Sequence, residues 1–329
     1  MAHRSSLKPM LNVSFGSDGD CPLIGRQILS SVDSSSFFHG LRGMRAPLGI
    51  YNASIARVCP RVSRYCNVIE PLFREIRIDP KSEGPASRAK VADALEAMLY
   101  AAAEHVDDIE NLASGFFRTH PLAKMDSRYR ELANRIDKCK KVTSTIANKI
   151  KHEQARVRLY ALEILHVGIP TTLHGFIIEG VNDGTVGPHR AVHSTHPVLS
   201  LTTIAWEVLE FVAAVSMALA RFLASFPKVN AEQQKLQCTL FADATKAAAR
   251  LPTYTFGEPH PFSRTSFRLS GEESCDGAPD SDIYGSIQRR WIQSSAMEFG
   301  GFAMTTEGDG VSKSFAMVNP TNVTLVHWQ

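Results

Sequence analysis

Apolar residues recur at every third or fourth position along residues 127–158. This spacing is typical of an amphipathic helix whose apolar stripe faces a protein core. The members of the stripe are Leu132, Ile136, Cys139, Val142, Thr143, Ile146, Ile150 and Val157. We therefore expect one long helix from Ser127 to Arg158, around which the rest of the chain is organised.

A longer helical pattern precedes it, because residues 88–117 keep the same spacing for about eight turns. The short segment 118–126 separates the two patterns, which predicts an antiparallel pair of helices. Further helices are expected at 48–77, 202–226 and 230–250. Pro60 and Pro71 should break or begin helices within 48–77, and Asn230 should cap the helix at 230–250.

Strands are expected in two parts of the chain. Residues 159–165 and 171–181 are rich in Leu, Ile and aromatic side chains and predict a pair of strands, with a candidate third strand at 185–192. Near the C-terminus, a hairpin and a further strand are predicted at 296–305, 311–318 and 324–328.

These elements predict a mainly α protein, in which a helical bundle at residues 48–250 carries a small β-sheet inserted at about 159–192. A β-containing C-terminal extension follows at 251–329, and its acidic stretch 271–283 is expected to be a mobile loop. Residues 1–47 are rich in Ser, Gly and Asp and show no sustained period, so we expect an N-terminal arm that is loosely ordered or lies along the protein surface.

The composition is that of an ordinary globular protein, since 329 residues, 44% of them hydrophobic, can form a substantial core. The six cysteines include no C-x-x-C pair, so we expect reduced thiols and neither disulfides nor zinc. The N-terminus has no continuous apolar segment, and charged residues interrupt 202–226, which predicts a buried helix. We therefore expect a cytoplasmic protein with no membrane partner.

Positive charge is concentrated in the predicted 127–158 helix. From Arg128 to Arg158 there are ten Lys or Arg and three acids, a net of +7, whereas the whole chain carries +3. At ~100° per residue, the face opposite the apolar stripe has no carboxylate and carries Lys138, Lys141, Thr145, Asn148, His152 and Arg156. Such a face suits an anion, although Lys and Arg also form the solvated face of ordinary helices.

The segment 147–153, ANKIKHE, resembles the signature of HEPN domains, which are helical bundles often found in RNA-targeting and defence proteins. That signature is an Arg, usually followed by a polar residue, and then a His a few residues later. Asn148 and His152 match the last two positions, and Ala147 stands where the family has its Arg. The resemblance covers the two long helices and implies a metal-independent endoribonuclease, in a defence or toxin system, that acts as a homodimer.

The residues themselves allow such chemistry. Asn148 and His152 are four apart and share one helix face. Histidine can transfer protons near neutral pH, so we assign His152 as the acid/base and Asn148 as its orienting hydrogen-bond partner. The phosphate contacts are assigned to Arg156, Lys149, Lys141 and Lys138. No cofactor or metal is expected, and a protein that binds RNA or phosphate without cleavage is the alternative to a ribonuclease.

Two other interpretations remain open. His189, His193 and His196 are spaced like metal ligands on a helix, but Pro188 and Pro197 bracket them and favour a loop, where this spacing loses its meaning. The chain could also be a non-catalytic interaction or scaffold module that binds another protein through its C-terminal β region. A solitary His152 would then be expected.

Overall fold

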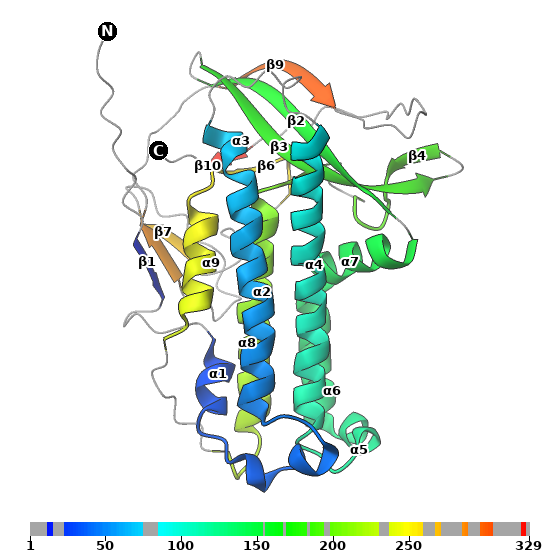
Figure 1. Ribbon diagram of the computed structural model, residues 1–329, viewed down its shortest axis with the longest axis vertical. Coiled ribbons are helices and arrows are strands. Elements are labelled where there is room, and N and C mark those ends of the chain that lie inside the picture. The colour runs from blue at the N-terminus through cyan, green and yellow to red at the C-terminus, as the bar shows by residue number, and fades with distance from the viewer. Residues whose placement is uncertain are drawn as a thin grey trace.

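The computed structural model of the protein describes residues 12–15, 23–74, 85–153, 155–166, 169–182, 185–193, 198–229, 237–258, 267–270, 285–288, 297–304 and 324–326. Within these residues the fold is mainly helical, with a small antiparallel sheet at one end of a helical bundle (Figure 1). The expected fold class is therefore confirmed.

The long helices of the bundle run along its longest axis (Figure 1). They are α2 (Pro47–Ile69), α4 (Pro85–Ser114), α6 (Ser127–Cys139), α8 (Thr203–Ala224) and α9 (Thr239–Ala249). The other helices flank them, namely α1 (Ile24–Leu29), η1 (Ser34–Ser36), η2 (Gly40–Arg42), α3 (Pro71–Arg74), α5 (His120–Met125) and α7 (Lys141–Glu153). The helices predicted from the patterns at 88–117 and 202–226 are confirmed, whereas α2 continues through Pro60, which we expected to break or begin a helix.

The central helix is α8, which is apolar on nearly all sides and mostly buried. A helix of that composition belongs in the middle of a bundle. Its length and hydropathy would also suit a membrane span, but 78% of its apolar window is buried inside the protein. The hydroxyl of Ser216 accepts hydrogen bonds from Tyr51 Oη at 2.9 Å and from the Gly25 N–H at 3.0 Å, which anchors α2 and α1 to α8.

The inserted sheet lies between α7 and α8 in the sequence, as predicted. β2 (Val157–His166) pairs antiparallel with β3 (Ile169–Asn182), and β4 (Thr185–Pro188) pairs with the end of β3. β5 (Leu199–Ser200) also pairs with β3, and β9 (Met297–Met304) pairs with the other edge of β2. A cluster of buried side chains lies against this sheet: Tyr160, Leu162, Leu173, Ile177, Val198, Tyr254 and Phe256. The C-terminal extension is therefore joined to the inserted sheet.

The remaining strands form two small groups. One contains β1 (Asn12–Phe15), β8 (Gly285–Gln288) and β7 (Phe267–Ser270), and the other contains β6 (Thr253–Thr255) and β10 (Thr324–Val326). The strands expected at 296–305 and 324–328 are thus present as β9 and β10. The strand expected at 311–318 and the acidic stretch 271–283 lie outside the described residues.

The expected single helix from Ser127 to Arg158 is wrong. α6 ends at Cys139, α7 begins at Lys141, and β2 already begins at Val157. The two helices point in different directions, because α6 packs against α8 while α7 packs against α4 (Figure 1). Each half buries its own part of the apolar stripe, and the spacing alone does not distinguish one helix from two that are joined at Lys140.

Within the expected N-terminal arm, residues 23–46 lie along the bundle and include α1, η1 and η2. Leu23, Ile28 and Leu29 are buried, and α1 packs against α8, because these few apolar residues suffice to attach a Ser-rich segment to the bundle. The helix expected at 230–250 begins at Thr239 with Cys238 as its N-cap residue. Asn230, the expected cap, lies outside the described residues.

Cys238 is disulfide-bonded, so the expectation of reduced thiols throughout is wrong at this position. Cys59, Cys66 and Cys139 are free thiols, and burial raises the pKa of Cys59 and Cys66 to about 12. A disulfide requires two Cβ atoms to approach within about 3.5–4.5 Å. The spacing of cysteines along the chain does not reveal that approach.

Gly115 leaves room for the buried ring of His39, which holds residues 37–42 against the end of α4. Nε2 of His39 lies 2.8 Å from the carbonyl oxygen of Leu112, and the N–H of Phe38 donates to the carbonyl of Gly115 at 3.1 Å. A Cβ atom at Gly115 would lie 2.4 Å from the imidazole ring. Any side chain at this position would therefore displace the ring or the backbone.

We expect Gly115→Ala to lower the free energy of unfolding by about 1–3 kcal/mol, because the added methyl group overpacks a buried contact. Gly40→Ala is the control, since a Cβ there meets nothing within 4 Å. Its effect should stay below about 0.5 kcal/mol. Urea unfolding measures both variants, and a wild-type midpoint for Gly115→Ala would contradict the prediction.

Candidate functional site

The candidate site is the exposed face of α7, whose other face packs on α4 and buries Ile146, Ala147 and Ile150. Asn148 and His152 lie one turn apart on the outer face, and both are exposed. In the part of the chain that the structure describes, neither side chain has a hydrogen bond or an ion pair. His152 is thus solitary, as the interaction module predicts, and both side chains are open to a ligand.

Polar contacts connect the end of α7 with the turn after β4. Nζ of Lys149 lies 2.5 Å from Oε1 of Glu153, and Nε2 of His189 lies 2.9 Å from Oε2 of the same carboxylate. Nδ1 of His189 accepts the Ala191 N–H at 3.1 Å, so Nε2 carries a proton and donates it to Glu153. Lys149, and then His189, hold the pKa of the exposed Glu153 carboxyl below its usual value. The charge of Lys149 is thus already compensated.

A buried ion pair lies where the sheet begins. Nε of Arg158 donates to Oε2 of Glu179 at 2.9 Å, and both side chains are less than one tenth exposed. The backbone N–H of Glu179 also donates to the carbonyl of Arg156 at 2.8 Å. These bonds fix the short connection between α7 and β2.

The structure brings together only part of the expected row of polar residues. Arg156 is exposed but follows the end of α7, and Lys138 is exposed on α6, so neither continues the face formed by Asn148 and His152. The side chain of Lys141 lies outside the described part of the chain. Ala147, at the position of the HEPN arginine, is buried in the core.

This face can hold a phosphate more readily than it can cleave one. Lys151 is exposed beside His152, and among the described residues it has no ion-pair partner. Cleavage would also need a fixed cation on the phosphate oxygens, for which a bidentate arginine is best suited. The position that the family uses for it holds the buried Ala147.

The rings of His189 and His193 already have protein partners. Nε2 of His193 accepts the Ile178 N–H at 2.8 Å, and both ring nitrogens of His189 are engaged, by Ala191 and Glu153. His196 lies outside the described residues. Within the described ranges, no group of three side chains is placed to hold a metal ion.

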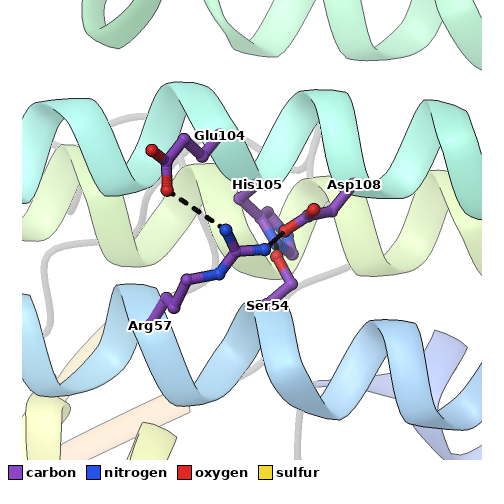
Figure 2. Close-up of polar contacts among 5 residues, drawn as sticks. All are labelled: Ser54, Arg57, Glu104, His105 and Asp108. Carbon is purple, nitrogen blue, oxygen red and sulfur yellow. Dashed lines mark hydrogen bonds and ion pairs between the residues drawn. The ribbon is translucent and has the colours of Figure 1, made fainter.

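A serine–histidine pair that the sequence did not indicate lies between α2 and α4 (Figure 2). Ser54 Oγ and His105 Nδ1 are 2.7 Å apart, and neither residue is more than 1% exposed. Such a pair can activate a serine nucleophile only where a substrate reaches it. Burial lowers the pKa of His105 to about 4, so the ring is neutral at pH 7. We interpret the pair as a structural contact.

Beside this pair, Arg57 on α2 bridges two carboxylates on α4 (Figure 2). Its Nη1 atom lies 3.3 Å from Oε2 of Glu104, and its Nη2 atom contacts Asp108. These side chains are partly exposed, so the bridge contributes little to stability.

A cavity of about 60 Å³ opens between α6 and α8. It is lined by Arg128, Glu131, Leu132, Arg135, Ala218, Arg221, Phe222 and Ser225. Arg128 pairs with Asp126 at 2.7 Å, and Arg135 pairs with Glu131 at 2.7 Å. At roughly 10–15 Å³ for each water, the cavity suits a few waters rather than a nucleotide.

Comparisons of the chain with protein-family models, with curated proteins and with solved structures find no match. The resemblance to HEPN domains therefore stays a prediction. The function has to be argued from the exposed face of α7 itself.

Proposed function

We propose that this protein binds RNA, without cleaving it, through the outer face of the last turns of α7. The observation that carries the proposal is the exposed pair Asn148 and His152, which have no partner among the described residues. Lys151 adds a positive charge beside them. Amide, imidazole and ammonium groups suit the phosphates and 2′-hydroxyl groups of an RNA strand.

Binding is favoured over cleavage because the cations near His152 are poorly placed for catalysis. Ala147 is buried, and Lys149 is already paired with Glu153. The negative end of the α7 dipole also lies at this surface and opposes an anion. We therefore expect moderate affinity that depends strongly on salt.

The test uses a labelled mixed-sequence RNA in EDTA, with filter binding at about 50 and 200 mM salt and gel analysis of the RNA. We expect salt-sensitive binding and intact RNA. Lys151→Ala should bind more weakly at both salt concentrations and lower the salt slope by about 1, which corresponds to the loss of one phosphate contact. The matched control is Arg61→Ala, which removes the same charge from the exposed surface of α2.

The outcomes separate the alternatives. RNA cleavage that His152→Ala abolishes would replace this proposal with the ribonuclease that the HEPN resemblance implies. Equal loss of binding in the control variant would show that general positive charge, rather than α7, carries the binding. No binding at either salt concentration would reject the proposal in favour of the interaction or scaffold module. Light scattering in solution checks the homodimer, which also stays a prediction.

A further inference from the structure

Positive charge gathers at the end of the bundle that lies away from the sheet, where residues 33–46, 115–130 and 221–229 meet (Figure 1). The Phe226 ring centroid lies 5.2 Å from that of Phe116 and 5.9 Å from that of Phe37, which ties the three segments together. They contain eight Lys or Arg and two Asp, a net of +6. Because the whole chain carries +3, the remainder carries −3. We call this surface the basic end.

Large apolar side chains are exposed at the same end. Leu41 is 85% exposed, Met125 74% and Leu122 49%. Among the described residues, only Val181 and Leu240 are further large apolar side chains with comparable exposure. Three of the five large apolar side chains that are exposed in the described part of the chain therefore lie at the basic end.

The fold holds these side chains outward. In α5 the small Ala123 is buried, whereas Leu122 and Met125 face solvent, the reverse of what core packing favours. Leu41 projects from η2, which is fastened to the end of α4 by its N-cap residue His39 and its last residue Arg42. His39 lies 2.8 Å from the Leu112 carbonyl, and Nη1 of Arg42 donates to the Ser114 carbonyl at 2.5 Å. The surface is thus formed in advance of any partner.

The basic end is poorly suited to bases of a nucleic acid. Single strands are bound by exposed aromatic rings that stack on bases. Here Phe116 and Phe226 are buried and pack on each other, and the guanidinium of Arg128 already lies 4.2 Å from the Phe226 ring centroid. The exposed apolar groups are aliphatic, and a phosphate backbone offers nothing to bury them against.

We propose that the basic end docks on a membrane surface that contains anionic lipids. Leu41, Leu122 and Met125 enter the boundary between headgroups and acyl chains, while Arg45, Arg118 and Lys124, which are exposed around them, contact lipid phosphates. Aliphatic and cationic side chains together are the means by which peripheral proteins bind anionic membranes. The contact needs no membrane-spanning segment and uses none of the residues assigned to RNA binding on α7.

The test is sedimentation of the full chain with vesicles of phosphatidylcholine alone or of phosphatidylcholine mixed with phosphatidylserine. We expect binding only to the mixed vesicles, and weaker binding in high salt. The affinity of Arg118→Ala/Lys124→Ala for the mixed vesicles should fall roughly fivefold for each cationic side chain that is removed. The affinity of Leu41→Ser/Met125→Ser for the mixed vesicles should fall about tenfold or more, because this variant keeps the cations of the basic end but lacks two of its apolar side chains. Thermal melting confirms that these surface variants are folded.

Control variants carry the same changes elsewhere, with Val181→Ser/Leu240→Ser for the apolar pair and Arg61→Ala/Arg64→Ala for the cations. Both should bind vesicles like the wild type. Failure of the wild type to sediment with mixed vesicles, or equal losses in the controls, would overturn the proposal. Loss of RNA binding in the basic-end variants with unchanged vesicle binding would instead make the basic end an RNA surface.

Discussion

Glu179→Gln is expected to lower the free energy of unfolding by about 3–5 kcal/mol, because it removes the carboxylate that offsets the buried charge of Arg158. Nε of Arg158 lies 2.9 Å from Oε2 of Glu179, and both side chains are less than one tenth exposed. Desolvation of two charges makes such a pair costly to form, but removal of one partner costs still more. Urea unfolding at neutral pH measures the effect.

The matched control is Glu104→Gln, which breaks an ion pair to Arg57 whose side chains are 49% and 58% exposed (Figure 2). Its loss should stay below about 1 kcal/mol, since water screens and replaces the contact. Arg158→Met/Glu179→Leu should recover most of the stability that Glu179→Gln loses, because it removes both charges of the pair. Similar losses for Glu179→Gln and Glu104→Gln would show that the buried pair is not isolated from water.

Acidification is expected to destabilise the protein between pH 6.5 and pH 4 through His105 and His174, because burial lowers the pKa of both from 6.5 to about 4. The unfolded chain binds a proton at each histidine below pH 6.5, whereas the folded protein does not until about pH 4. Their contribution is therefore fully present above pH 6.5 and is lost as the pH falls towards 4. At about 1.4 kcal/mol per pKa unit, each loss is roughly 3 kcal/mol.

Glu258 acts in the opposite direction in part of this range. Burial raises the pKa of its carboxyl from 4.5 to about 7, so the folded protein binds a proton there before the unfolded chain does. Through this group the free energy of unfolding rises as the pH falls from 7 to 4.5. The gain offsets the loss that one of the two histidines causes. The net pH dependence of the wild type alone is therefore a weak test.

The decisive comparison is between the wild type and His105→Gln, which can still bond to Ser54 but cannot be protonated. Urea unfolding from about pH 7 to about pH 4.5 should show a less steep loss of stability in the variant. Of the nearby charges, Asp108 raises and Arg57 lowers the pKa of His105. Both charges are still present in the variant. His120→Gln, an exposed control, should follow the wild type. Identical slopes in His105→Gln and wild type would contradict the prediction.

Much of the fold could be predicted from the sequence because helices and strand pairs follow from local periodicity. The apolar surface of α8 indicates a central helix, and the patterns at 88–117 and 171–181 correspond to α4 and β3. Of the candidate site, the sequence determined that Asn148 and His152 share a helix face, since they are four residues apart within α7.

Tertiary structure decided what depends on segments that are distant in the chain. The break at Lys140 arises because α6 and α7 pack on different helices, and it removes Lys138 from the face of His152. Arg156 is absent from that face because α7 ends at Glu153 and β2 begins at Val157. The contact of Glu153 with His189, the pairing of β9 with β2, and the meeting of three basic segments at one end also join remote residues. Local spacing fixes which side of an element is apolar, but only packing fixes which other element that side meets.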